Sequence, residues 1–364
     1  MKSTGIYIHV PFCAKKCPYC DFYSEGYSGS SAQAYVDAVI RNLSHYSDRE
    51  RTADTIYFGG GTPSLLRGEQ LRSIIGAVGR SFRLADDTEI TLEANPCTLT
   101  PDKLREFFSV GINRLSIGVQ SMNDSELRLL GRTHTAERAE RAVLDAFDTG
   151  FTNISCDLMT ALPDQTAESI GYSIERLAAL PITHVSSYIL KVEDGTPFDR
   201  EGLADALPDD ELSSELYLKT VEMLAEKGFE QYEISNFAKS GFKSRHNLKY
   251  WQCREYLGIG PSAHSCFGGR RFAVGRDLDG FISSEHQRVD ITDDSPCRFE
   301  EYAMLRLRLT EGLDLRKIGE HRSDIEKKIP DLLKVGYINY DGNVLSLTPR
   351  GAIVSNSVIG YLIF

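Results

Sequence analysis

The stretch HVPFCAKKCPYCDF, residues 9–22, holds three of the chain's eight cysteines. Cys13, Cys17 and Cys20 have the spacing C-x3-C-x2-C and follow the apolar segment 5–10, which we predict to be a strand. In a reducing compartment, closely spaced cysteines are more often metal ligands or catalysts than disulfide partners. We therefore predict that these three thiolates form a metal centre at the end of the first strand.

The number of cysteines leaves two kinds of metal centre open. Structural zinc takes four ligands, commonly from paired C-x2-C motifs, and this stretch has one such pair, with His9 inside the predicted strand. A 4Fe–4S cluster also takes four ligands, one for each iron, so three cysteines leave one iron free for a ligand from outside the chain. The spacing favours the iron–sulfur cluster over zinc.

Composition and charge exclude several classes of function. The 364-residue chain is 41% hydrophobic, enough for a large core, and has a net charge of −11 and a pI of about 5.3. This acidity argues against a nucleic-acid binder and against more than peripheral contact with a membrane. We find no signal peptide and no run of about 20 apolar residues. We expect a cytoplasmic protein, either a monomer or a dimer.

Short apolar segments alternate with helical patterns up to residue 228. The helix at 100–111 begins with a capping Thr100 and Pro101, and the helix at 136–150 ends in a glycine. Six strand–helix units predict a parallel sheet with right-handed crossovers, either doubly wound or an incomplete barrel. The predicted strands are 5–10, 54–60, 88–94, 112–120, 151–159 and 182–190, and the predicted helices are 31–46, 68–82, 100–111, 136–150, 166–180 and 209–228.

The pattern changes after residue 228. Residues 229–290 are rich in aromatic residues and glycine and contain HNLKYW at 246–251, so we predict strands and loops that extend over the mouth of the α/β core. Residues 291–364 predict several helices and a hairpin at 337–348 with an Asp-Gly turn. This order predicts a small α+β domain that resembles a winged helix. Because the chain is acidic, we interpret it as a packing module and not as a DNA reader.

A C-x3-C-x2-C motif after the first strand of an α/β chain resembles the radical S-adenosylmethionine (SAM) superfamily. In that family the amino and carboxylate groups of SAM chelate the open iron of a 4Fe–4S cluster. The reduced cluster then cleaves SAM to give a 5′-deoxyadenosyl radical. The resemblance implies a partial (β/α)6 barrel for residues 1–228, with the cluster held by Cys13, Cys17 and Cys20.

Further stretches match the superfamily where predicted strands end, which is where barrel sites are built. By this resemblance the glycines of YFGGGTPSLL, residues 57–66, contact the methionyl amino group, Glu93 and Asp157 face the ribose or nucleoside, and Arg132 suits a carboxylate. Taken singly, each polar residue is better explained as an ordinary strand end, but their joint placement favours a site. The implied SAM residues are Tyr7, Tyr19 through its backbone, Gly60, Gly61, Thr62, Glu93, Gln120, Arg132 and Asp157.

Five stretches together resemble one branch of the superfamily over nearly the whole chain: IYIHVPFCAKKCPYCDF, YFGGGTPS, SIGVQS, HNLKYW and GIGPSAHS. The branch contains the oxygen-independent coproporphyrinogen III oxidases and the HemW family of heme chaperones. The oxidases carry a fourth cysteine two positions after the third, where this chain has Phe22, and an N-terminal extension that this chain lacks. The resemblance therefore implies a heme chaperone that passes heme to an acceptor protein and lacks the decarboxylase activity, with no catalytic residue assigned. The alternative is the oxidase itself, which decarboxylates coproporphyrinogen III to protoporphyrinogen IX.

The HNLKYW stretch is typical of the chaperones and implies a heme contact. Imidazole can ligate heme iron, and aromatic rings can pack on the macrocycle. The other interpretation is a strand with core aromatics and a histidine that is bonded locally. His264 is a second candidate ligand, and the five cysteines outside the motif are interpreted as ordinary buried thiols. The implied heme residues are His246, Asn247, Tyr250 and Trp251.

Overall fold

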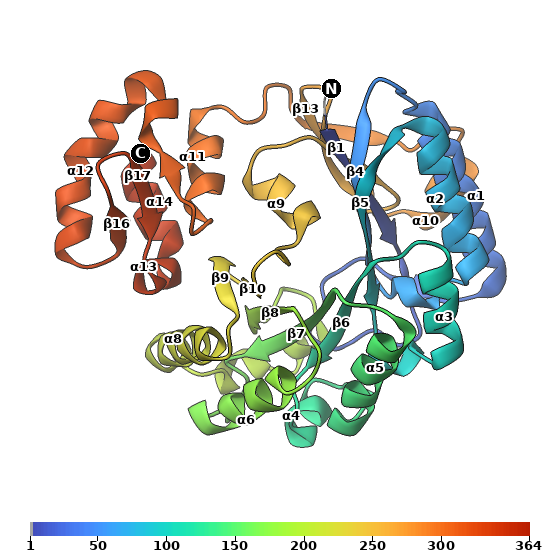
Figure 1. Ribbon diagram of the computed structural model, residues 1–364, viewed down its shortest axis with the longest axis horizontal. Helices are drawn as coiled ribbons and strands as arrows, with labels where there is room; N and C mark the ends of the chain where they lie inside the picture. Colours follow the sequence, from blue (N-terminus) through green and yellow to red (C-terminus); the bar gives the residue numbers. More distant parts are fainter. Residues whose placement is uncertain (1–2) are drawn as a thin grey trace.

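The computed structural model describes residues 3–364, and its centre is one curved sheet of twelve strands (Figure 1). The strand order is β14-β13-β12-β11-β1-β4-β5-β6-β7-β8-β10-β9, and the two edge strands do not pair with each other. The six predicted strands are all present and pair in parallel, which confirms a partial barrel. They are β1 (Ser3–Val10), β4 (Thr52–Gly60), β5 (Arg83–Ala94), β6 (Arg114–Gln120), β7 (Ile154–Thr160) and β8 (His184–Ile189).

The six predicted helices follow these strands. The Thr100 side chain accepts a hydrogen bond from the Lys103 N–H, and Gly150 ends its helix with φ 115°, so both predicted helix ends are confirmed. Within residues 3–228, two short helices were not predicted: α4 (Asp124–Leu129), capped by Asn123, and α7 (Pro197–Arg200). The six long helices are α1 (Gly29–His45), α2 (Gly68–Ser81), α3 (Pro101–Ser109), α5 (Ala136–Thr149), α6 (Ala167–Ala178) and α8 (Asp210–Glu226).

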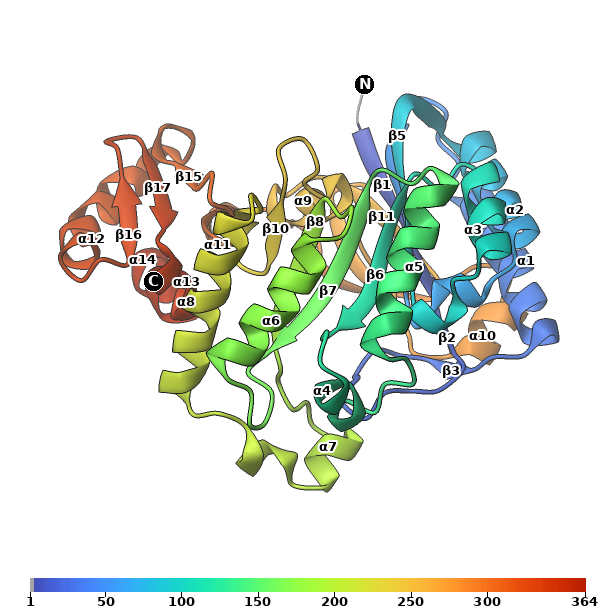
Figure 2. The same ribbon diagram turned by 60° about the horizontal axis from the view of Figure 1, so that its bottom comes forward.

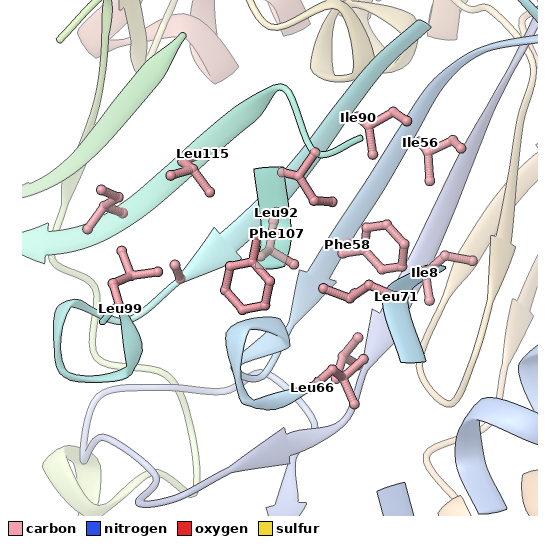
Figure 3. Packing of buried hydrophobic residues seen from close by; sticks show 14 of the residues in the cluster. Ile8, Ile56, Phe58, Leu66, Leu71, Ile90, Leu92, Leu99, Phe107 and Leu115 are labelled. Atoms are coloured by element: carbon pink, nitrogen blue, oxygen red, sulfur yellow. The ribbon is translucent and has the colours of Figure 1, made fainter. Parts of the chain in front are cut away.

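Side chains along the parallel strands alternate between an apolar outer face and a polar inner face. Phe58 and Leu92 point outwards and pack with Phe107 of α3, and all three are fully buried (Figure 3). Burying each such side chain contributes roughly 1.5–3 kcal/mol, so this layer holds the helices on the sheet. The inner face therefore collects polar and ionisable groups, among them Tyr7, Thr55, Tyr57, Glu89, Glu93, Arg114, Asp157 and His184.

Residues 229–290 extend the sheet at both edges, which corrects the expectation that they lie over the barrel mouth. Two strands add to β8, and four add beyond β1, the first of them parallel to it. The segment was misplaced because strand pairing over such distances leaves no local pattern in the sequence. The added strands are β9 (Glu230–Glu233), β10 (Asn236–Ala238), β11 (Tyr256–Ile259), β12 (His264–Phe267), β13 (Arg270–Val274) and β14 (Val289–Asp293), with α10 (Leu278–Ser283) before the last.

The HNLKYW stretch forms a short helix, α9 (Arg245–Trp251), capped by Ser244. Lys249 pairs with Asp54 at 2.7 Å, and His246 bonds to Thr55 at 2.7 Å, so α9 lies at the amino-terminal end of β4. The cysteine loop follows the opposite, carboxyl end of β1. Figure 2 shows α9 at one end of the sheet and the two short strands of the cysteine loop, β2 (Phe12–Cys13) and β3 (Glu25–Gly26), at the other.

The C-terminal residues form a small α+β domain with its own apolar core, as predicted. The predicted hairpin is present, and a third short strand joins it in the order β15-β17-β16. Between residues 3 and 364 no helix has both the length and the apolar character needed to cross a membrane. The elements are α11 (Phe299–Leu307), β15 (Leu313–Asp314), α12 (Arg322–Lys334), β16 (Ile338–Tyr340), β17 (Val344–Leu347), α13 (Pro349–Ile353) and α14 (Ser355–Ile363).

Candidate functional site

A cavity of about 380 Å³ opens at the carboxyl ends of the parallel strands. This volume lies within the range of small-molecule sites. Of the residues predicted to bind the cluster or SAM, Tyr7 does not line this cavity: its hydroxyl bonds to His9 Nδ1 at 3.1 Å on the inner face of β1. The predicted cluster and SAM residues that do line the cavity are Cys13, Cys17, Tyr19, Cys20, Gly60, Gly61, Thr62, Glu93, Gln120, Arg132 and Asp157.

The cysteine loop is fastened to the glycine-rich loop that follows β4. The Gly61 N–H donates to the Val10 carbonyl at 2.8 Å, and the Thr62 N–H donates to the Phe12 carbonyl at 2.7 Å. A side chain on Gly61 would place its Cβ 2.6 Å from that same Phe12 oxygen. Glycine is therefore required for the two loops to approach this closely.

The three cysteines are half-buried, and two of them contact other predicted site residues. The Thr62 hydroxyl donates to Cys13 Sγ at 3.5 Å, and Arg132 Nη1 donates to Cys17 Sγ at 3.4 Å. In this structure the three sulfur atoms do not all lie within 4.8 Å of one another. Within the described chain, the residues that line the cavity include no fourth cysteine and no histidine. Three thiols therefore fit a 4Fe–4S cluster, which keeps one iron for an outside ligand, better than a structural zinc ion with four protein ligands.

Two half-buried carboxyl groups form the inner wall of the cavity. Glu93 accepts hydrogen bonds from the Tyr57 hydroxyl at 2.8 Å and from the Gly60 N–H at 3.2 Å. Burial, with a smaller contribution from the nearby Asp157, raises the pKa of Glu93 to about 7. Burial also raises the pKa of Asp157 to about 6. Carboxylates in such a wall are acceptors for the hydroxyl groups of a ligand.

Arg132 supplies one of the positive charges of the cavity. Its Nη2 donates to the Gly118 carbonyl at 2.6 Å, and its Nε is buried with no hydrogen-bond partner in the described part of the chain. A buried guanidinium N–H without a partner costs free energy unless a ligand supplies an acceptor. The planar guanidinium is suited to a carboxylate, so Arg132 marks where an acidic group of a ligand would bind.

Several lining residues were not predicted. Ser116 and Gly118 alternate with Gln120 along β6, so the two-residue period of a strand was a usable signal. Tyr188 lies at the carboxyl end of β8, so the strand-end rule would have found it. The other unpredicted lining residues are Lys15, Lys16, Phe22, Ala94, Asn95 and Met159.

The four residues proposed for heme do not reach this cavity. His246 is fully buried, its Nδ1 and Nε2 lie 2.7 Å and 2.9 Å from the hydroxyls of Thr55 and Tyr250, and burial lowers its pKa to about 3. The structure thus gives His246 the locally bonded role and places it in the barrel interior. Trp251 points elsewhere, with the Arg308 guanidinium 4.9 Å from its ring centre. Asn247 is half-buried, and the second candidate histidine, His264, is exposed on β12.

Removing the Glu93 charge should change how stability depends on pH. Because the folded pKa is about 7 and the usual value is 4.5, the folded protein binds a proton between these values that the unfolded chain does not. Stability of the native chain therefore falls as pH rises through this window, by about 3 kcal/mol from this group. We expect Glu93→Gln to remove that fall, as measured by urea unfolding of the apo-protein between about pH 5 and about pH 8.

The matched control for this prediction is Glu137→Gln, an exposed glutamate on α5. It should follow the native pH dependence throughout. A Glu93→Gln variant whose stability runs parallel to that of the native chain over the whole window would contradict the prediction.

Known proteins are similar to this chain over nearly its whole length. The family model of the radical SAM superfamily matches residues 7–177. The heme chaperone HemW of Escherichia coli is 34% identical over 98% of this chain and 97% of its own, and that of Bacillus subtilis is 34% identical over 99% and 98%. Among solved structures, the coproporphyrinogen III oxidase HemN of Escherichia coli, a radical SAM enzyme, superposes with a TM-score of 0.81. It covers 100% of this chain and 90% of its own at 21% identity, a similarity of fold.

Proposed function

This chain belongs to the radical SAM superfamily and, within it, to the family of the heme chaperone HemW, and from that membership we propose that it binds heme and delivers it to an acceptor protein. We further propose that it holds a 4Fe–4S cluster with SAM as the fourth ligand. The observation that carries the proposal is the convergence of three cysteines, Arg132 and two carboxyl groups on one cavity. That cavity lies in a chain that matches the chaperones from end to end.

Each group in the cavity has a separate task in this proposal. Cys13, Cys17 and Cys20 ligate three irons of the cluster, which when bound supplies an open iron site and a transferable electron. Arg132 pairs with the carboxylate of SAM, for which its unpartnered Nε is available. Glu93 and Asp157 accept hydrogen bonds from the ribose hydroxyls. The glycines of the loop after β4 let backbone N–H groups approach the ligand.

The competing decarboxylase function has less support. Phe22 stands where the resemblance places the fourth cysteine of the oxidases, and its side chain is 66% exposed at the cavity wall. The likeness to the solved oxidase is one of fold, whereas the chaperones match the sequence itself over nearly the full chain. The chaperone function is therefore the one we propose.

We propose that heme contacts the helix α9 through side chains other than His246. Asn247, Tyr250 and Trp251 are half-buried, so a limited movement exposes them, whereas His246 would have to lose both of its ring hydrogen bonds. We retain three functional units: residues 1–228 hold the cofactor, residues 229–290 carry the heme-contacting helix, and residues 291–364 form the domain that packs beside it. Support for the last unit is its separate apolar core.

The test of this function is a pair of anaerobic assays on reconstituted protein. Hemin titration should give stoichiometric binding, followed by the Soret band, and supply of SAM, reductant and coproporphyrinogen III should give no decarboxylated product. We expect Trp251→Leu to weaken hemin binding about tenfold, because an aromatic ring contributes about 1.4 kcal/mol to such packing. Tyr361→Leu, an exposed aromatic in the C-terminal domain, is the matched control and should bind hemin as the native protein does.

Two results would contradict this proposal. Formation of protoporphyrinogen IX would establish the oxidase in place of the chaperone. Absence of hemin binding by protein with an intact cluster would remove the chaperone function while leaving the SAM site in place.

A further inference from the structure

A second group of metal-ligating side chains lies outside the cavity, between the sheet and the C-terminal domain. One ligand atom each from Cys253, Cys297 and Glu301 lies within 4.8 Å of the other two. A third thiol, that of Cys266, interacts with Cys297 but lies outside this 4.8 Å group, so its side chain would turn towards the other three to complete a site. These four residues come from three segments that are distant in the sequence: the turn after α9, the strand β12 and the start of α11.

Local contacts hold these groups towards one another. The Cys297 thiol donates to the Cys253 carbonyl at 3.7 Å, and the Cys297 N–H donates to the Glu301 carboxylate. Arg271 Nε lies 2.7 Å from the other Glu301 oxygen and fixes the orientation of that carboxylate. Arg271 is also the cross-strand partner of Cys266 between β12 and β13. Binding of a metal would displace the protons of these thiols, because the thiolate is the form that ligates a metal.

We propose that Cys253, Cys266, Cys297 and Glu301 form a second, structural zinc site, separate from the cluster. Three thiolates and one carboxylate supply the four donors that tetrahedral zinc requires. Thiolate ligands select zinc over magnesium and calcium, which take oxygen ligands. Arg271 acts as the outer partner that orients Glu301.

A disulfide explains the arrangement less completely. It would join two of the three thiols and leave the third thiol and Glu301 without a role. The zinc site uses all four side chains. Zinc would also connect two parts of the chain. Its ligands would link the start of α11, and with it the C-terminal domain, to the turn that follows the heme-contacting helix α9.

The test separates this site from the cluster cysteines. A Cys13→Ser/Cys17→Ser/Cys20→Ser background removes those thiols, and the protein is dialysed against zinc alone, then analysed for bound metal. We expect about one zinc per chain. Adding Cys297→Ser should lower zinc affinity on the order of a hundredfold. Adding Cys97→Ser, an exposed cysteine elsewhere, should leave zinc bound. Cobalt in place of zinc should give thiolate-to-cobalt absorption that weakens with Cys297→Ser and persists with Cys97→Ser.

Native protein with its cluster intact provides a second measurement if the triple background folds poorly. It should contain zinc in addition to its iron, and Cys297→Ser should lose the zinc while keeping the iron. Failure to hold zinc in either form overturns the proposal, as does equal zinc content with and without Cys297. A Cys253–Cys297 disulfide found by mass spectrometry in freshly purified protein also overturns it. None of these results bears on heme or SAM binding, so the two proposals fail separately.

Discussion

A Cys17→Ser variant, reconstituted anaerobically, should retain almost none of the about four irons per chain expected for the native protein. With three cysteines and one position left to SAM, the cluster has no spare protein ligand. A serine hydroxyl is a poor replacement because iron–sulfur clusters are held by thiolates. Cys17 also accepts a hydrogen bond from Arg132 at 3.4 Å, so its loss removes a ligand and an ordered contact of the cavity together.

Iron and acid-labile sulfide analysis, with the visible absorption of the cluster, measures this effect. Cys97→Ser is a close control, because the Cys97 thiol lies 3.6 Å from the hydroxyl of Thr133, next to Arg132. Cys97 does not line the cavity, and its variant should keep the full cluster. A full 4Fe–4S cluster in Cys17→Ser would refute the assignment of the three ligands.

Arg132→Leu should weaken SAM binding by about a hundredfold or more. Truncating one partner of a buried, hydrogen-bonded charge pair costs about 2–5 kcal/mol, largely because the other charge is left without a partner. Arg132→Lys keeps the charge but loses the planar pair of N–H donors, and should fall between the native protein and the leucine variant. The measurement is equilibrium binding of SAM under anaerobic conditions to protein of known iron content.

Iron content matters here because Arg132 also contacts Cys17. Comparison at equal cluster loading separates loss of SAM binding from loss of the cluster. Arg128→Leu, an exposed arginine on the neighbouring helix α4, is the control and should bind SAM as the native protein does. An unchanged dissociation constant in Arg132→Leu would show that the SAM carboxylate binds elsewhere.

Much of the barrel and its site was predictable because its signals are local. Apolar segments of strand length alternate with capped helices, and residues such as Glu93 and Gln120 sit where strands end. Parallel strands bring those ends to one edge, so sequence position alone predicted that they meet. Tyr7 does not line the cavity because its hydroxyl bonds to His9 Nδ1, 3.1 Å away. Asp157 is equally far from the end of its strand, β7, but its side chain does reach the cavity.

The features that were missed depend on contacts between distant segments. The helix α9 is seven residues long, and its place is set by Asp54, Thr55 and Glu89, about 160 to 190 residues earlier. Cys253, Cys266 and Cys297 are more than ten residues apart, and no spacing rule predicts that they converge. These residues come together only when the sheet is assembled. The sequence around each cysteine therefore predicts only an ordinary buried thiol.

The parallel pairing of β1 with β11 affects how the chain folds while the ribosome synthesises it. Gly5 pairs with Tyr256, about 250 residues later. At 5–20 residues per second, the ribosome needs on the order of 10–50 s to make the partner of a strand that emerged first. During that interval one edge of β1, next to the cysteine loop, has no partner and is open to pairing with other chains. The nascent chain would therefore benefit most from molecular chaperones, or from slow translation initiation, during this interval, before β11 pairs with β1.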